Sequence, residues 1–267
     1  MIYIQLGELQ VSKIILGSNP ISGFSHLGKD IDLQMRRYFT VSRIKDLFFQ
    51  AEELGVNTVI GRTDAFITRV MLEYWDEGGK MQWFAQTCPE FGDPINSVIR
   101  AHNNGAKACY IHGGVMDHLL ANGKLDSIKP VIDEIRKRKM LVGVAGHLPA
   151  VHIWAKENLA LDFHMCSYYN PIPRQRSAEH VNGFEEQYLD EDREQMVDLI
   201  STINKPVIHY KIFAAGRNNP QEAIAYTASK MRSGDMVCIG VFQKDNPNML
   251  AEDIRLFELQ PAFIKLV

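Results

Sequence analysis

The sequence predicts an α/β fold, a single (β/α)8 TIM barrel with an N-terminal β-hairpin. Short apolar runs recur along the chain, each ending in polar residues and each followed by apolar residues at helical spacing. Eight such strand-helix units follow one another at intervals of roughly 25 to 40 residues, and barrels of this type need about 250 residues. The chain has 267. The predicted strands are residues 14–20, 57–64, 80–87, 106–114, 140–147, 162–170, 206–217 and 235–244.

One domain over residues 1–267 is expected, because no stretch rich in Pro, Gly or Ser separates two halves. Hydrophobic residues make up 46% of the chain and charged residues 23%, which supplies enough apolar material for one core. The hairpin occupies residues 1–14 of this domain and turns at Gly7 and Glu8. A loop through Gly23 and Gly28 then follows the first barrel strand, with a short helix over residues 32–39.

The outer helices are marked by apolar spacing and by capping residues. Gly55 ends the first of them, and Asp93-Pro94 and Asn219-Pro220 each place a capping side chain before a first-turn proline. The residues after strand four, which include Asp117 and His118, are expected to form a loop. A polar insertion is expected at residues 172–183. The expected outer helices are residues 42–54, 65–75, 94–104, 127–138, 149–158, 191–203, a helix from 219 onwards and 249–257.

Charge and hydropathy argue against nucleic acid and membranes as partners. The net charge of −3 gives no basic surface for a polyanion, and the basic cluster at residues 136–139 lies at an expected helix end, where cations suit the helix dipole. No apolar run reaches the length of about 18 residues that a membrane helix needs. The four cysteines show no CxxC spacing, so we interpret them as reduced thiols. We expect a cytoplasmic protein whose partner is a small-molecule substrate.

Candidate site residues come from the alternation of side chains along each strand. The outer face of a barrel strand packs against helices, so polar residues at strand ends are expected to point inward. In strand seven Ile208, Tyr210 and Ile212 suit the helix layer, which predicts that His209 and Lys211 lie inside. The inward residues expected to ring one mouth of the barrel are Asn19, Arg62, Asp64, Gln86, His112, His147, Tyr168 and Lys211. Such a convergence of polar groups predicts a ligand site.

The chain resembles the aldo-keto reductase superfamily over nearly its whole length. The motifs that carry the resemblance are VSKIILGSNP after the hairpin, CYIHGG at strand four, GVAGH followed by Pro149, YYNP, HYKIFAAGR and IGVFQKDNPNMLAEDIRLF. The likeness is one of pattern with few identities. It implies a (β/α)8 barrel, and it implies that His112 matches the histidine of the family's catalytic tetrad of Asp, Tyr, Lys and His.

The other three members of that tetrad are missing. The aspartate position falls among Ile60, Gly61 and Arg62, the tyrosine position near Phe66, and the lysine position on Gln86. Ordinary ketone reduction needs the tyrosine to donate a proton to the carbonyl while NADPH delivers a hydride. The resemblance therefore implies the fold without the usual reductase activity.

The favoured function is acid/base chemistry on a sugar or hydroxy-carbonyl substrate, as in an isomerase, an epimerase or a lyase. His112 and His147 would carry protons near neutral pH, Lys211 would act as base or electrophile, and Asp64 completes the catalytic candidates. The substrate-binding candidates are Arg62 for an anionic group, together with Asn19, Gln86 and Tyr168 for orientation.

Four alternatives remain open at this point. An NAD(P)-dependent oxidoreductase with a rearranged proton donor would place Arg217 and Lys244 near the cofactor phosphates, in loops where barrels bind anions. An aldolase would form a Schiff base on Lys211. A metal enzyme would use Asp64, His112 and His147, although no HxH or HExxH spacing supports a metal site. A non-catalytic barrel would bind a ligand as a sensor.

We expect the purified protein not to reduce simple aldehydes with NADPH at a rate typical of aldo-keto reductases. The reason is that Phe66 and Gln86 stand where the proton-donating tyrosine and its lysine partner would be. The rate is measured with a panel of aldehydes as the loss of NADPH absorbance at about 340 nm. Robust NADPH oxidation would show that another residue protonates the carbonyl.

Overall fold

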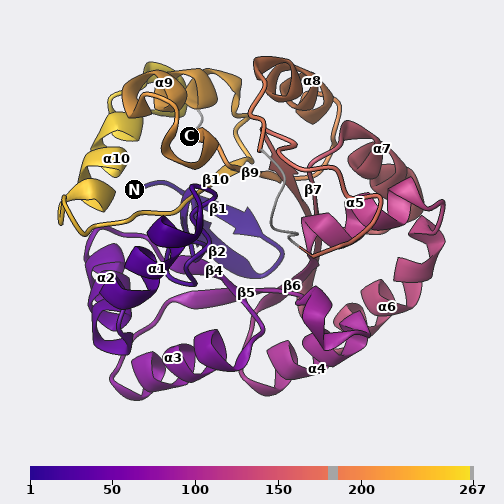
Figure 1. Cartoon of the computed structure of the whole chain (residues 1–267), viewed down its shortest axis with the longest axis horizontal. Coiled ribbons are helices and arrows are strands. Elements are labelled where there is room, and N and C mark those ends of the chain that lie inside the picture. The colour runs from indigo at the N-terminus through magenta and orange to yellow at the C-terminus, as the bar shows by residue number, and fades with distance from the viewer. Residues whose placement is uncertain (180–185, 265–267) are drawn as a thin grey trace. The chain divides into compact units, whose positions relative to one another are not determined.

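A computed structural model of the chain describes residues 1–179 and 186–264, and confirms the predicted α/β barrel. In this described part, eight parallel strands form a closed barrel in the order β10-β3-β4-β5-β6-β7-β8-β9, with helices between successive strands (Figure 1). The barrel strands are β3 (Ile14–Gly17), β4 (Thr58–Arg62), β5 (Gln82–Gln86), β6 (Ala108–Ile111), β7 (Leu141–Gly146), β8 (Phe163–Ser167), β9 (Val207–Tyr210) and β10 (Met236–Ile239).

The N-terminal hairpin is also confirmed. Strands β1 (Tyr3–Leu6) and β2 (Leu9–Ser12) pair antiparallel, with Leu6 opposite Leu9. Asn57, at the start of β4, joins the hairpin to the barrel, since its side chain accepts from the Ser12 amide at 2.8 Å and donates to the Gln10 carbonyl at 2.9 Å.

Most helices begin where their capping residues predict. Asp93 accepts a hydrogen bond from the Ile95 amide, and Asn219 accepts from the amides of Gln221 and Glu222, each ahead of a first-turn proline. The expected helices correspond to α1 (Lys29–Tyr38), α2 (Val41–Glu53), α3 (Ala65–Asp76), α4 (Pro94–Asn103), α6 (Lys129–Lys137), α7 (Pro149–Asn158), α8 (Asp190–Ile200), α9 (Pro220–Lys230) and α10 (Met249–Glu258). None of the helices in residues 1–179 and 186–264 is long and apolar enough to cross a membrane.

Helix α5 (Gly113–Ala121) occupies the stretch after β6 that was expected to be a loop, so that prediction is wrong. The helix begins with two glycines. Because glycine has a low helix propensity, the sequence gives no signal for a helix start here. The side chain of His112 caps it, because its Nδ1 accepts a hydrogen bond from the Gly114 amide at 3.1 Å. Contacts with β7 add the tertiary support that the local sequence lacks.

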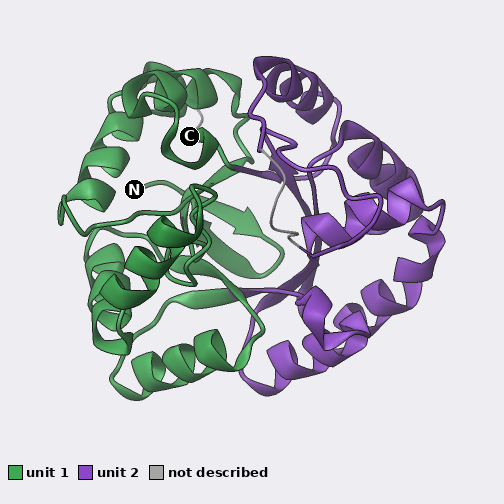
Figure 2. Cartoon of the chain, viewed as in Figure 1, with its two compact units in different colours: residues 1–83, 211–267 green, residues 84–210 purple. Residues whose placement is uncertain are grey.

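The chain divides into two compact units (Figure 2). Unit 1 consists of residues 1–83 and 211–267, and unit 2 of residues 84–210. In unit 2, helices α4, α6, α7 and α8 contact strands β6, β7, β7 and β8 respectively. The polar insertion expected at residues 172–183 lies between β8 and α8, and its residues 180–183 are outside the described residues. The expectation of a single domain stays a prediction.

The two faces of the sheet in unit 2 follow from the strand register. Tyr110 pairs with Gly143, and Gly143 pairs with Phe163, so these positions share one face. The rings of Phe84, Tyr110 and Phe163 pack together there, with centroids 5.7 Å apart for the first and third and 6.3 Å for the second and third. We call this the inner face, because the opposite face contacts the helices.

The helix face of β8 and β9 carries the residues that were expected inside. His164 Nδ1 lies 3.1 Å from Nδ1 of His152 on α7, and Tyr168 hydrogen-bonds His209 at 3.0 Å between its hydroxyl and Nδ1. Tyr210 pairs with Ser167, which lies on the same face of β8 as Phe163, so Tyr210 belongs to the inner face. The alternation predicted for strands six and seven is therefore wrong. It placed Tyr168 and His209 inside and Tyr210 outside.

Lys13 is a buried cation in unit 1, directly after the hairpin. Its Nζ donates to the Ser233 carbonyl at 3.2 Å and lies 5.5 Å from the centroid of the Phe263 ring. Burial lowers the pKa of Lys13 from 10.5 to about 8, and the charge of Asp235 only partly opposes this effect. Asp235 itself is paired with Arg232, at 2.7 Å between Nη2 and Oδ1.

We expect Lys13→Met to raise the free energy of unfolding at pH 7 by about 1–3 kcal/mol, because an apolar chain of similar length replaces a buried charge. The folded-state pKa of about 8 lies below the unfolded value of 10.5, so the gain is full below pH 8 and fades as the pH rises towards 10.5. Urea unfolding at several pH values measures it, with the exposed Lys107→Met as the control. A gain that does not change with pH would contradict the assignment to the lysine charge.

Candidate active site

A buried aspartate and a histidine form the centre of the candidate site in unit 2. Asp117 lies on α5 and His147 follows β7, and the two side chains are 1% and 8% exposed. Nδ1 of His147 lies 2.6 Å from Oδ2 of Asp117, and the His147 amide donates to Oδ1 at 3.1 Å. Because Nδ1–H donates its hydrogen bond to the carboxylate, the lone pair of the neutral imidazole is on Nε2.

Tyr210, the last residue of β9, extends this pair to a third group. Its hydroxyl lies 3.4 Å from Nε2 of His147 and 3.5 Å from the Gly146 carbonyl, and the two rings meet edge to face at 5.9 Å between centroids. Burial and the charge of Asp117 raise the pKa of Tyr210 well above its usual value of 10.0. The phenol is therefore neutral and can donate a proton. Sequence reasoning missed both Asp117 and Tyr210.

Gly113 makes room for this arrangement. A Cβ at this position would lie 3.0 Å from Cε1 of His147 and 3.1 Å from the hydroxyl of Tyr210. Contacts that short require the neighbouring atoms to shift by a few tenths of an ångström. The glycine that follows the predicted catalytic His112 therefore opens the space in which His147 and Tyr210 meet.

His112 lies at the start of α5, beside this cluster in the chain. Its backbone amide donates to Oγ1 of Thr87 at 3.0 Å, which ties the end of β6 to the end of β5. Its Nδ1 accepts the Gly114 amide, so the proton of the neutral ring is on Nε2. His112 is half-buried. Together with His147, it comes from unit 2, as does the half-buried Gln86.

Arg62 and Asp64, which were expected in the mouth, form an ion pair in unit 1. Nε of Arg62 lies 3.0 Å from Oδ2 of Asp64, and the guanidinium lies over the Phe24 ring, 5.2 Å from its centroid. Oδ1 of Asp64 accepts the Ile67 amide at 2.8 Å and caps α3. These contacts give Asp64 a structural role that accounts for its position after β4.

Lys211 lies directly after β9, in unit 1, with a φ of 58°. Its Nζ is 3.0 Å from Nε2 of His26. Nη2 of Arg217 donates to the His26 carbonyl at 2.9 Å and Nη1 to the Ala214 carbonyl at 3.2 Å. Lys244 donates to Oε1 of Gln34 at 2.9 Å. The two cations predicted to bind cofactor phosphates thus hydrogen-bond protein oxygen atoms.

The remaining predicted residue in unit 1, Asn19, is exposed, and its carbonyl accepts the Phe24 amide at 2.9 Å. Asn19, Arg62, Asp64 and Lys211 belong to unit 1, so the ring of eight residues around one mouth stays a prediction. Tyr168, predicted to bind substrate, hydrogen-bonds His209 on the helix face, which is opposite to the face that carries Tyr210. Within residues 1–179 and 186–264, no group of three or more His, Cys, Asp or Glu side chains is placed to hold a metal ion.

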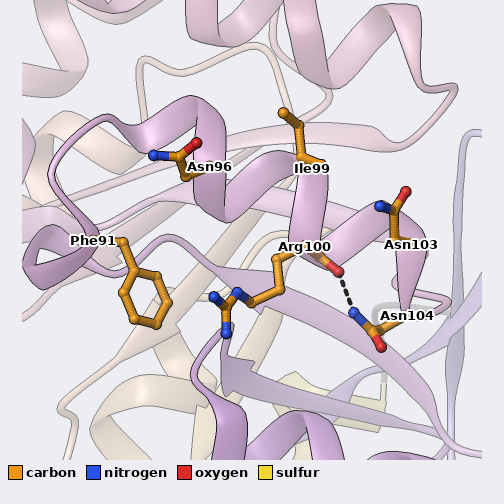
Figure 3. Close-up of a pocket in the computed structure, with 6 residues that line it drawn as sticks. All are labelled: Phe91, Asn96, Ile99, Arg100, Asn103 and Asn104. Carbon is orange, nitrogen blue, oxygen red and sulfur yellow. Dashed lines mark hydrogen bonds between the residues drawn. The ribbon is translucent and has the colours of Figure 1, made fainter.

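A separate surface pocket lies on α4 and the short helix η1 (Pro89–Phe91) of unit 2 (Figure 3). The guanidinium of Arg100 lies over the Phe91 ring, 4.5 Å from its centroid, and Nδ2 of Asn104 donates to the Arg100 carbonyl at 2.8 Å. None of the residues that line this pocket is one of the predicted site residues. The lining residues are Phe91, Asn96, Ile99, Arg100, Asn103 and Asn104.

The fold is similar to solved aldo-keto reductase structures. A candidate aldo-keto reductase from Pseudomonas aeruginosa, PA4992, matches with a TM-score of 0.62 and 14% identity over 96% of this chain and 94% of its own. The aldo-keto reductase AKR11C1 from Bacillus halodurans matches with a TM-score of 0.56 and 12% identity over 100% and 96%. No protein-family model and no curated protein sequence matches the chain. The chain thus has the fold of these proteins, a (β/α)8 barrel, at 12–14% sequence identity.

Proposed function

We propose that this protein is an enzyme that moves protons on a small sugar or hydroxy-carbonyl substrate, as an isomerase, epimerase or lyase does. The observation that supports the proposal most directly is the series Asp117, His147, Tyr210, in which a carboxylate, an imidazole and a neutral phenol follow one another at hydrogen-bonding distances. A base beside an acid, both largely shielded from water, is what such chemistry requires.

Each group has a distinct part in the proposed reaction. Asp117 accepts the hydrogen bond of Nδ1–H of His147 and so holds the imidazole in the tautomer whose lone pair is on Nε2. Nε2 takes a proton from a carbon next to the substrate carbonyl, and Tyr210 gives its proton to the carbonyl oxygen, which yields an enol. The proton then passes from Nε2 to the tyrosine oxygen across the 3.4 Å that separates them, and both residues return to their starting state.

His112 can assist at the oxygen atoms. Since Nδ1 accepts the Gly114 amide, the Nε2 proton is available to hydrogen-bond a substrate hydroxyl or a developing oxyanion. Lys211 stays a proposed base or electrophile. Its Nζ hydrogen-bonds Nε2 of His26, and a Schiff-base role requires this amine to attack the substrate carbonyl in its neutral form.

The second proposed function is an oxidoreductase in which Tyr210 replaces the missing tyrosine as proton donor. Its contact with Nε2 of His147 favours such a role, and the nicotinamide cofactor would supply the hydride. The residues present do not fit the phosphates well, because Arg217 and Lys244 hydrogen-bond protein oxygens. For either function we propose the cytoplasm as the location, on the grounds of four cysteines present as thiols.

Substitutions of Asp117, His147 and Tyr210 should strongly lower the rate of proton exchange without unfolding the protein. We expect His147→Gln and Tyr210→Phe each to lower turnover by about 10² or more, the usual scale for a positioned acid or base. Asp117→Asn should also lower it, because the wrong ring nitrogen then carries the proton. Uptake of deuterium from D2O into a panel of sugars and hydroxy-carbonyl acids, followed by mass spectrometry, gives the rate. Melting temperatures confirm folding.

Tyr168→Phe is the matched control for Tyr210→Phe. It removes one buried hydroxyl that hydrogen-bonds a histidine, but on the helix face of the sheet. Its exchange rate should equal that of the unchanged protein. If both substitutions lower the rate equally, or if Tyr210→Phe leaves it unchanged, then Tyr210 is not the acid.

Gly113→Ala tests the geometry of the same cluster. The added methyl would press on His147 and on the hydroxyl of Tyr210 at 3.0 and 3.1 Å and push them apart. We expect a loss of deuterium exchange of about tenfold or more, since misplacement by fractions of an ångström weakens acid/base catalysis. The melting temperature should change little, as alanine suits the first turn of a helix. Unchanged exchange would mean that the His147–Tyr210 contact is not used.

A further inference from the structure

Arg174 is a buried cation in the connection between β8 and α8. The residue is only 9% exposed. Nη1 donates to two backbone carbonyls, those of Ala178 at 3.4 Å and Glu179 at 2.6 Å. Among the residues that the structure describes, no hydrogen bond or ion pair is found for Nε or Nη2. Neither nitrogen is among the fully buried side-chain atoms without a hydrogen-bond partner in the described residues, so both remain accessible to a bound group.

The segment around Arg174 is fixed to helix α5, the helix that carries Asp117. Nδ1 of His118 donates to the Arg174 carbonyl at 2.8 Å, and Nδ2 of Asn122 donates to the Gln175 carbonyl at 3.2 Å. Gly114 allows the close approach, because a Cβ there would lie 2.4 Å from the Ala178 carbonyl oxygen. The position of Arg174 is thus set by the same helix that positions the acid/base series.

Electrostatics also connect Arg174 with the acid/base series. Burial lowers the pKa of Arg174, while the negative charges of Asp117, Tyr210 in its ionised form and Glu186 raise it. The guanidinium is therefore close enough to the series to interact with its charges. It is not salt-bridged to Asp117, whose two carboxylate oxygens bind His147.

We propose that Arg174 binds the oxyanion group, a carboxylate or a phosphate, of the substrate on which His147 and Tyr210 act. This inference rests on the proposed function and narrows its substrates to anionic carbonyl compounds. Guanidinium groups bind both kinds of oxyanion through paired N–H donors, and Nε with Nη2 forms such a pair. The sequence-based assignment of this task to Arg62 is less favourable, since Arg62 pairs with Asp64.

Anion binding can be measured without any turnover. Isothermal titration of the full chain with inorganic phosphate and, separately, with malonate should show one site for at least one of them, and the better probe identifies the preferred oxyanion. Arg174→Gln should weaken that binding by about tenfold or more, the effect of losing charge-assisted hydrogen bonds. Arg174→Lys, which keeps the charge and loses the fork, should weaken it to an intermediate extent.

Arg100→Gln is the matched control, because it removes one cation from the exposed face of α4 in the same unit. It should leave anion binding unchanged. Equal weakening by Arg100→Gln and Arg174→Gln, or no binding of either probe, would overturn the proposal. Melting curves check folding, and if Arg174→Gln does not fold, then Arg174→Lys decides.

His147→Gln separates this inference from the proposed function. It should keep anion binding and lose deuterium exchange. Anion binding at Arg174 without deuterium exchange into any substrate would contradict the proposed acid/base function but not the anion site. Exchange with no effect of Arg174→Gln on anion affinity or on the KM of the substrate would sink only the anion site.

Discussion

The hydrogen bond between Asp117 and His147 is the interaction on which the candidate site depends. It joins helix α5 to the end of β7, fixes the tautomer of the imidazole, and turns Nε2 towards Tyr210. The aspartate is buried, and a buried carboxylate is costly unless its oxygens are bonded, as both are here. One short contact therefore joins helix α5 to the end of β7 and orients the imidazole that Tyr210 contacts.

The sequence predicted the barrel, the hairpin and most helices, because strand runs and capping residues are local signals. It also predicted His112 and His147 at strand ends in unit 2. Alternation failed in β8 and β9 because a strand buried on both faces has no polar side to set the phase. Val207 and His209 alternate with Ile208 and Tyr210, and either pair could face the helices. Only the register with β7 settles which pair does.

Other residues were hard to predict because the same position serves two purposes. Asp64 follows a strand and precedes a helix, where an active-site carboxylate and an N-cap have the same sequence context, and the structure shows the cap. Asp117 was missed for the opposite reason. It lies inside a helix whose two leading glycines conceal it, and its partner is 30 residues away, so no local pattern connects the two.

The two glycines at the start of α5 also limit how this site can be transplanted. Gly113 leaves space for His147 and Tyr210, and Gly114 leaves space for the segment that carries Arg174. A design that copied only the polar side chains onto another barrel would have the same functional groups but would lack the space that the two glycines leave for them. The part to transfer is a helix that begins with two glycines. These glycines lower the intrinsic stability of the helix, but they let neighbouring groups approach its backbone closely on two sides.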